Sequence, residues 1–210
     1  MRVLVTGGSG LLGKLLIPLL SEYPRVKVSA PSHEELDITR LKRQYEYDLI
    51  IHAAAYTDVI QAEKDKKECA KVNVGGTLSL LELSYPTPFV YISTEYAKSP
   101  VNYYASTKAV GEILTSLWSE NYLIIRTLFK PNPFPWDKAF IDQYTQGDYV
   151  DVIAPLIAHQ IMKWDKCTSK TIYIGTGRKT MLALAQRTKP DVIPCSINDV
   201  EGVKIPKDYE

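Results

Sequence analysis

The amino-acid sequence predicts an α/β fold, a doubly wound parallel sheet with a small, reduced C-terminal lobe. Short β-branched segments alternate with longer amphipathic segments from the first residue onward, which is typical of repeated β-α-β units. The first short segment, 2–7, ends at a glycine, as does a later one at 170–177. The chain has 210 residues, 45% of them hydrophobic, and is therefore long enough to bury the core that such a sheet requires.

The strands and helices follow from the local pattern in chain order. Segments rich in valine and isoleucine predict strands at 2–7, 25–30, 48–55, 88–94 and 122–127. Segments of helical periodicity between them predict helices at 11–22, 58–83 and 103–119. We expect a kink at Pro18 in the first helix, because proline removes an amide donor, and one break within the second helix.

The character of the sequence changes after Arg126. Residues 130–140 include three prolines and the large aromatic side chains Phe134 and Trp136, and this composition predicts a loop. From Pro190 onward we expect irregular structure. The segment between these regions resumes the β-α pattern, with a short strand leading into a helix at 149–164.

Strands that follow a crossover helix can rejoin a parallel sheet. We therefore divide the chain into a domain at 1–127, which the glycine-rich turn at 7–13 predicts to bind NAD(P), and a reduced substrate-binding lobe at 128–210. The lobe is predicted to return to the sheet in part, at 149–153 and 170–176.

A glycine-rich turn follows the first strand directly. The turn has glycines at positions 7, 10 and 13, which permit a tight turn, a close approach of the backbone to a pyrophosphate, and packing of the next helix against the strand. The N-terminus of that helix offers free amide donors and the positive end of its dipole to an anion. The pattern predicts a Rossmann-type dinucleotide site formed by Gly7, Ser9, Gly10, Leu11, Leu12 and Gly13.

The end of the second strand favours NADP over NAD. An NAD site usually has an acidic residue there, which binds the ribose hydroxyls, whereas this sequence continues as 30–33, "APSH". The absence of a carboxylate removes a repulsion against a 2′-phosphate, and Ser32 or His33 could donate a hydrogen bond to one. NAD stays the alternative because no arginine lies in this loop. Asp37 is expected to reach the adenine edge.

A second motif lies at 102–112, where two tyrosines stand side by side on a predicted helix. Tyr104 precedes Lys108 by four residues, so both side chains lie on one helix face. A phenol titrates near ~10, and a neighbouring ammonium should lower that pKa, which makes Tyr104 the predicted proton donor. Tyr103 lies about 100° around the helix and is expected to line the pocket wall.

The fourth strand ends with Ser93 and Thr94. In open parallel sheets ligands bind beyond the carboxyl ends of the strands, so these hydroxyls are predicted to contact the cofactor and the substrate carbonyl. A capping or turn role is the alternative for both residues. His52, at the end of the third strand, is predicted to be structural.

Composition argues against several other functions. A net charge of +1 gives no electrostatic reason to expect nucleic acid or an anionic membrane as a partner. Cys69, Cys167 and Cys195 are too few and too scattered for a disulfide framework or a metal cluster, and they fit a cytoplasmic protein without a metal site. No uninterrupted apolar run reaches the length of a membrane span.

Taken together, these motifs resemble the extended short-chain dehydrogenase/reductases, and most closely the dTDP-4-dehydrorhamnose reductase-like group. The matching segments are 5–13, 35–39, 48–59, 71–77, 91–96, 103–112, 124–127 and 149–157. The resemblance implies cofactor contacts from Gly7, Gly10, Gly13, Asp37, Ile38, Ala53, Ala54 and Ala55. It also implies a helix asparagine at Asn73 and a catalytic set of Thr94, Tyr104 and Lys108.

The sequence departs from that group on the substrate side. Group members usually carry a phenylalanine–aspartate–glycine stretch and a sizeable loop before the tyrosine helix, where this chain has only 95–102. The first hypothesis is an NAD(P)-dependent reductase of a carbonyl, the 4-keto group of a deoxy nucleotide-sugar. Its substrate-side candidates are Thr94, Tyr103, Lys130, Phe134, Trp136 and Arg178.

Two other functions remain open at this point. One is a non-catalytic NAD(P)-binding subunit resembling the regulatory subunit of methionine adenosyltransferase, which the short lobe favours and the complete catalytic set disfavours. The other is a nucleotide-sugar epimerase. The resemblance also raises a homodimer as an expectation.

Overall fold

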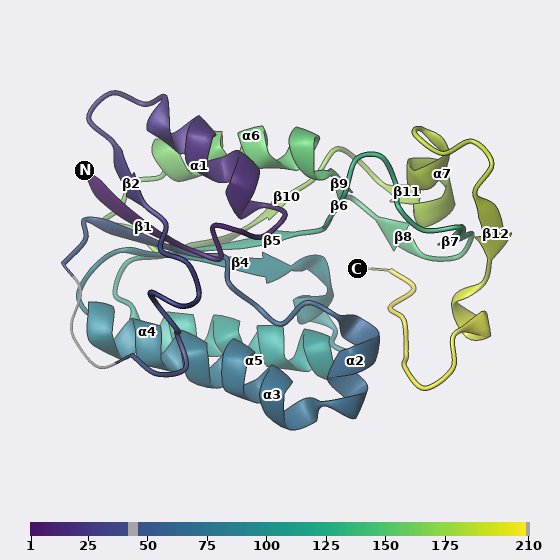
Figure 1. The fold of residues 1–210 in the computed structure, drawn as a ribbon, viewed down its shortest axis with the longest axis horizontal. Helices are drawn as coiled ribbons and strands as arrows, with labels where there is room; N and C mark the ends of the chain where they lie inside the picture. The colour runs from purple at the N-terminus through teal and green to yellow at the C-terminus, as the bar shows by residue number, and fades with distance from the viewer. Residues whose placement is uncertain (42–45, 209–210) are drawn as a thin grey trace.

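A six-stranded parallel sheet runs through the centre of the computed structural model, which describes residues 1–41 and 46–208 (Figure 1). The order is β10-β5-β4-β3-β1-β2, and all pairings are parallel. The strands are β1 (Arg2–Thr6), β2 (Lys27–Ser29), β3 (Leu49–His52), β4 (Phe89–Thr94), β5 (Tyr122–Thr127) and β10 (Lys170–Ile174). The chain builds outward from β1 in both directions, which confirms the predicted doubly wound α/β class.

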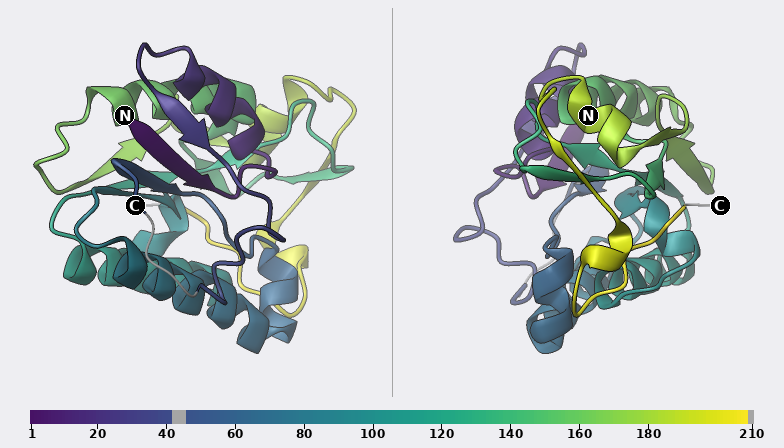
Figure 2. Two further views of the ribbon diagram at one scale, coloured as in Figure 1. Left: turned by 60° about the vertical axis from the view of Figure 1, so that its left-hand side comes forward. Right: turned by 90° about the vertical axis from the view of Figure 1, so that its right-hand side faces the viewer.

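Helices cover both faces of this sheet (Figures 1 and 2). One face carries α1 (Gly13–Ser21) and α6 (Val150–Lys163), and the other carries α4 (Thr77–Ser84) and α5 (Tyr103–Trp118). Alternate residues of a strand point to opposite faces. Val3 and Val5 accordingly pack in the cluster that contains α1 and α6, whereas Leu4 packs with α4. Because both faces are buried, the strands read as continuous apolar runs.

The segment predicted as one long, once-broken helix consists of four parts. They are α2 (Val59–Lys64), α3 (Lys66–Ala70), the π-helix η1 (Lys71–Gly76) and α4. The break lies at Asp65, whose carboxylate accepts a hydrogen bond from the Glu68 amide at 3.4 Å and caps α3. The π-helix was not predicted; its wider turn accompanies the burial of Asn73 in the interior.

The prediction of a sheet strand at 149–153 is wrong. The strand here, β9 (Asp148–Tyr149), pairs with β6 (Phe129–Lys130) outside the main sheet, and α6 begins at Val150. Buried residues in α6 recur at 3.6-residue spacing, so its apolar run forms a helix face packed on α1 rather than a strand. The second predicted return is confirmed, because β10 pairs with β5 along its length.

The C-terminal lobe is built from two excursions of the chain beyond the edge of the sheet (Figure 1). Its short elements are β7 (Lys138–Phe140) with β12 (Ile193–Cys195), β8 (Tyr144–Thr145) with β11 (Lys179–Thr180), α7 (Met181–Gln186) and η3 (Ile197–Asp199). The predicted loop at 130–140 therefore ends in a strand, and the tail after Pro190 is less irregular than expected. A separate hydrophobic cluster, which includes Phe134 and Tyr149, holds the lobe together.

Substitutions at two glycines should separate packing from backbone effects. A Cβ at Gly111 on α5 would collide with the buried Tyr91 hydroxyl, whereas one at Gly75, exposed on η1, would meet no atom within 4 Å. We expect Gly111→Ala to lower the free energy of unfolding by roughly 1–3 kcal/mol. Gly75→Ala should raise the free energy of unfolding by roughly 0.4–1 kcal/mol, because alanine lowers the conformational entropy of the unfolded chain. Urea denaturation measures both, and equal effects of the two variants would contradict the packing argument.

Candidate active site

The glycine turn between β1 and α1 has room only for glycine at two positions. Gly7 has φ 74°, and a Cβ on it would lie 2.6 Å from the Ala54 backbone nitrogen. A Cβ on Gly13 would collide with the Gly7 carbonyl. The turn is closed by a hydrogen bond from the Gly10 amide to the Gly7 carbonyl at 3.0 Å. No side chain among the described residues caps α1, so the start of this helix is open to a phosphate group.

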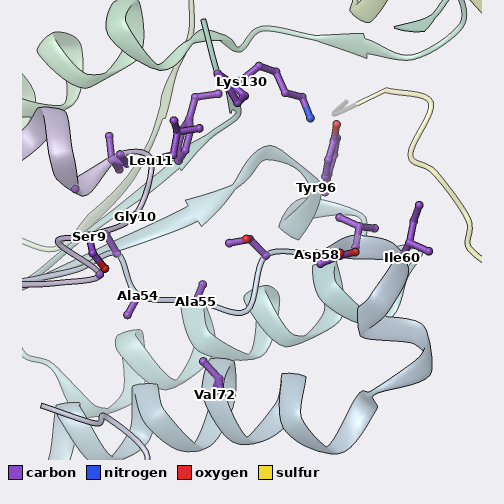
Figure 3. Close-up of a pocket in the computed structure, with 18 of the residues that line it drawn as sticks. Ser9, Gly10, Leu11, Ala54, Ala55, Asp58, Ile60, Val72, Tyr96 and Lys130 are labelled. Atoms are coloured by element: carbon purple, nitrogen blue, oxygen red, sulfur yellow. The ribbon is translucent and has the colours of Figure 1, made fainter. Parts of the chain in front are cut away.

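A cavity of about 1220 Å³ opens from this turn toward the lobe (Figure 3). The predicted site residues that line it are Gly7, Ser9, Gly10, Leu11, Leu12, Gly13, His33, Asp37, Ile38, Ala53, Ala54, Ala55, Lys130, Phe134 and Trp136. The predicted residues outside its lining are Ser32, Ser93, Thr94, Tyr103, Tyr104, Lys108 and Arg178. The structure therefore brings the predicted cofactor residues and the aromatic loop together around one space, whereas the hydroxyl and amine groups predicted for catalysis are not part of its lining.

At the end of the cavity near β2, Asp37 is the most constrained polar residue. Its Oδ1 accepts hydrogen bonds from the Thr39 amide at 2.9 Å and the Thr39 hydroxyl at 2.8 Å. These bonds, with smaller contributions from His33 and Arg40, hold the pKa of Asp37 below its usual value. Arg40 Nε lies 3.6 Å from Asp37 Oδ2, so this region does contain an arginine. Sequence reasoning overlooked it because it lies beyond the loop that was considered.

Ser32 is not a cavity residue, contrary to prediction. Its hydroxyl accepts from the Glu35 amide at 3.3 Å, and its own amide donates to Glu35 Oε2 at 2.8 Å. These reciprocal bonds hold Ser32 in a local turn. His33, next in the chain, does line the cavity and lies 3.8 Å from Asp37.

The helix α5 carries Tyr104 and Lys108 on one face. It begins after Asn102, whose side chain caps it by accepting from the Ala105 amide at 2.8 Å. The Lys108 ammonium lies 4.1 Å from the centre of the Tyr91 ring, and burial lowers the pKa of Lys108 to about 7 although Glu112 opposes the shift. Burial also raises the pKa of Tyr104.

The expectation that Lys108 lowers the pKa of Tyr104 is therefore wrong for the structure as it stands. Loss of solvation is the main cause of the upward shift of this pKa, with a smaller contribution from Cys69, and among the described residues no hydrogen bond involves the Tyr104 hydroxyl. Tyr104 is consequently held as a neutral phenol, the form that can give up a proton.

The two hydroxyls that end β4 point to different partners. Ser93 donates to Glu112 Oε1 at 2.5 Å, and Glu112 also accepts from Arg126 Nη2 at 2.6 Å. The predicted cofactor contact of Ser93 is thus replaced by a buried polar cluster between β4, β5 and α5. Thr94 Oγ1 accepts from the Tyr96 amide at 3.4 Å and caps the short helix η2 (Glu95–Lys98), which is the capping role named above as the alternative.

Two predicted substrate-side residues lie elsewhere. Tyr103 faces the neighbouring helices, where its amide donates to Glu63 Oε1 at 2.7 Å and Lys66 Nζ lies 5.4 Å from its ring centre. Arg178 pairs with Asp208 at 2.5 Å and stacks 3.8 Å from the centre of the Tyr144 ring. Neither side chain lines the cavity.

The lobe end of the cavity is aromatic and carries one buried amine. The rings of Phe134 and Trp136 pack edge to face with their centres 5.0 Å apart, and Lys130 Nζ lies 5.0 Å from the Trp136 ring centre. Burial lowers the pKa of Lys130. Lys130 and Tyr96 reach toward one another across this end (Figure 3).

Sequence reasoning missed several lining residues here, namely Tyr96, Gln143, Val200, Ile205 and Pro206. Tyr96 could have been found, because it follows the strand end at Thr94. Gln143 Nε2 donates to the Tyr96 hydroxyl at 3.0 Å. The last three come from the tail, where no local pattern signals a cavity wall.

Neither a metal-ligand cluster nor a membrane-spanning helix occurs in residues 1–41 and 46–208. No group of three His, Cys, Asp or Glu side chains in those ranges is placed to hold a metal ion. Likewise, none of the described helices is long and apolar enough to cross a bilayer.

His52 is buried between two threonine hydroxyls, as a structural residue should be.

The buried Lys108 should make stability depend on pH. Between pH ~7 and the ordinary lysine pKa the unfolded chain binds more protons at this site than the folded one, so its contribution to stability rises with pH. We expect Lys108→Met to be more stable than wild type at pH 6, by roughly 1–4 kcal/mol, and the difference to shrink above pH ~7. Urea denaturation at pH 6, 7.5 and 9 measures this, with exposed Lys98→Met as the matched control. A Lys108→Met protein less stable than wild type at pH 6 would contradict the argument.

Comparison with known proteins places these features in a family. Residues 1–155 match the family model described as "RmlD substrate binding domain". The chain is 34% identical over 148 residues to a dTDP-4-dehydrorhamnose reductase of Aggregatibacter actinomycetemcomitans, and the match covers 60% of this chain and 50% of that protein. The chain thus spans about half the length of the curated relatives it matches.

Two solved structures share the fold over the full chain. One, from Clostridium acetobutylicum and described as a dTDP-4-dehydrorhamnose reductase, has a TM-score of 0.84 at 21% identity and covers 100% of this chain and 89% of its own. The dTDP-4-dehydrorhamnose reductase of Bacillus anthracis, solved in complex with NADP, has a TM-score of 0.80 at 23% identity, with 100% and 88% covered. With well over half of its residues matched by the family model, the chain belongs to the RmlD substrate-binding domain family, within the extended short-chain dehydrogenase/reductases.

Proposed function

We propose that the protein is an NAD(P)-dependent reductase of a carbonyl, the 4-keto group of a deoxy nucleotide-sugar. The observation that carries the proposal is the pairing of Tyr104 and Lys108 on α5, next to the end of β4, in a sheet whose glycine turn opens the large cavity. Lys108 is buried and Tyr104 half-buried, and both have shifted pKa values, a property that clusters at active sites. Relatives named as reductases support the same chemistry.

The cofactor half of the cavity fits a dinucleotide. The space that a Cβ would fill at Gly7 and Gly13, together with the uncapped start of α1, suits a pyrophosphate. Asp37 and Ile38 would flank the adenine, and Ala53–Ala55 would line the rest of the bound molecule. When bound, the nicotinamide coenzyme supplies a hydride.

NADP is the proposed coenzyme, with NAD as the alternative. No acidic residue occupies 30–33 to repel a 2′-phosphate, while His33 lines the cavity nearby. Arg40 lies beside Asp37, within the same turn region, and adds a positive charge there. The NADP in the Bacillus anthracis relative supports this choice.

In the proposed reaction Tyr104 acts as the acid. Its hydroxyl O–H bond breaks as the proton passes to the substrate carbonyl oxygen, which becomes the product hydroxyl. The phenolate left behind would be stabilised by the Lys108 ammonium, and formation of that phenolate would in turn favour the charged form of Lys108. The Thr94 hydroxyl, now a cap of η2, would hold the carbonyl oxygen.

The residues proposed to bind the substrate lie at the end of the cavity next to the lobe. Phe134 and Trp136 can stack on a base or sugar ring, and the buried Lys130 amine can meet a diphosphate. Tyr103 and Arg178 are not part of this proposal, because their side chains are engaged away from the cavity. The free cysteines support a reducing compartment such as the cytoplasm.

The proposal further includes a homodimer formed through α5. Val110, Ile113 and Leu117 recur at helical spacing, and all three are exposed, Leu117 by 75%. Trp118 extends the same apolar surface. An apolar stripe of this kind on a solvent-facing helix favours pairing with a second helix.

Turnover tests the reductase directly. Wild type should oxidise NADPH, and NADH more weakly, with a 4-keto-deoxy nucleotide-sugar from a panel, as followed by nicotinamide absorbance. Tyr104→Phe should lose about 10²- to 10⁴-fold in kcat, because it lacks the proton, and should still bind coenzyme. Tyr103→Phe, one residue away but facing Glu63 and Lys66, is the matched control and should remain active.

The same experiment separates the competing functions. Tight coenzyme binding without turnover on any member of the panel would favour a binding subunit over a reductase. Interconversion of sugars without net coenzyme consumption would favour an epimerase. Equal activity in Tyr104→Phe and wild type would refute the assigned proton donor.

Light scattering after size-exclusion chromatography tests the dimer. Wild type should elute as a dimer, and Leu117→Glu should shift it to monomer, because a carboxylate would be buried in the apolar interface. Leu156→Glu, an equivalent change at an exposed leucine on α6, should leave the dimer intact. A monomeric wild type at tens of micromolar would rule the interface out.

A further inference from the structure

A chain of buried polar side chains links the glycine turn to the tyrosine helix. Its members are Thr6 on β1, His52 on β3, Thr77 on α4, Asn73 on η1 and Thr107 on α5. All five are at most 4% exposed. They come from five elements that surround one side of the cavity, yet none of the five except Thr6 lines it.

The hydrogens in the first half of this chain can be assigned without ambiguity. The single hydroxyl hydrogen of Thr77 goes to the Asn73 carbonyl at 2.7 Å, since a carbonyl can only accept. Thr77 Oγ1 must then accept from His52 Nε2 at 3.0 Å, which makes Nε2 the protonated nitrogen. Burial lowers the pKa of His52 to about 3, so the ring is neutral and Nδ1 accepts from the Thr6 hydroxyl at 2.7 Å.

This series of hydrogen bonds starts at the backbone that forms the proposed coenzyme cradle. Thr6 Oγ1 accepts from the Ala54 amide at 3.3 Å. Ala54 lines the cavity wall (Figure 3) and is the residue whose backbone a side chain at Gly7 would strike. The position of His52 is thereby tied to the narrowest point of the turn.

The second half of this series of hydrogen bonds runs from Asn73 to Tyr104. The Asn73 amide holds both backbone groups of Tyr56, accepting from its nitrogen at 2.7 Å and donating to its carbonyl at 3.1 Å. It also donates to Thr107 Oγ1 at 2.9 Å, and the Thr107 hydroxyl donates to the Tyr104 carbonyl at 2.8 Å. Each member of the network therefore donates to the next one, in one direction from the turn to the helix, while the two bonds to Tyr56 run both ways.

We infer that His52 is a positioning residue that, through Thr77, Asn73 and Thr107, sets the distance between the coenzyme cradle and Tyr104. The inference rests on the proposed reductase. Its physical basis is that a fully satisfied buried network has one low-energy arrangement and resists displacement of any member. Reduction of a carbonyl needs the hydride donor and the proton donor on one substrate at the same time, so a small misplacement of α5 should slow the reaction more than it weakens coenzyme binding.

Substitution of Thr77 interrupts the chain with the least change in shape. We expect Thr77→Val to lower kcat roughly 10- to 100-fold while the Kd for coenzyme changes little, and Thr77→Ser to restore most of kcat. Thr115→Val is the matched control: Thr115 is equally buried, but its hydroxyl bonds only to Gly111 within α5, so kcat should stay at the wild-type level. The double variant Thr77→Val/Thr107→Val should be little slower than the slower single variant, because both interrupt one path.

Two results would overturn the inference. One is a Thr77→Val enzyme with wild-type kcat, whatever its thermal stability, because a merely structural role predicts a loss of stability alone. The other is a ¹⁵N spectrum of wild type in which His52 is the Nδ1–H tautomer, which the bond directions forbid. An inactive wild type would instead refute the proposed function, while the spectrum would still decide the assigned directions.

Discussion

The site depends on one close approach between two backbones, that of Gly7 and that of Ala53–Ala54. The strands β1 and β3 are neighbours at the switch point of the sheet, and a Cβ at position 7 would lie 2.6 Å from the Ala54 nitrogen. With only hydrogen there, the chain can turn sharply, begin α1 above the sheet and leave the carboxyl edge open. The cavity and the buried polar chain behind it both start from this contact.

Around that contact the interior contains two kinds of buried polar group. Glu112 is fully compensated, since Ser93 and Arg126 both donate to it, and it joins α5 firmly to the sheet. Lys108, one turn away, contacts only the face of the Tyr91 ring among the described interactions. Burial of an amine with so little compensation costs stability, and proteins accept such costs mainly where function requires them. The contrast supports the proposal that the N-terminal half of α5 is its reactive part.

The fold was largely predictable from the sequence, because the sheet strands are short apolar runs and the glycine turn has few other interpretations. The cavity lining around the glycine turn was predictable for the same reason, apart from Ser32, which does not line it and whose hydroxyl accepts a hydrogen bond within a local turn. The failures concern side chains whose direction depends on tertiary packing. Ser93 and Tyr103 lie one residue from the predicted catalytic groups, yet their side chains meet Glu112 and Lys66, partners far away in the sequence. The tail residues of the cavity wall gave no signal for the same reason.

The order of the last elements has a consequence for how this family changes over time. The sheet is completed by α6 and β10, which lie between the two excursions that make up the lobe, so the lobe is inserted into the sheet domain at two surface points. Each excursion can gain or lose residues while the core on α1 and α6 keeps its packing. Related structures can therefore differ in these insertions while they share the sheet and its covering helices with this chain, as the Clostridium acetobutylicum structure does at a TM-score of 0.84.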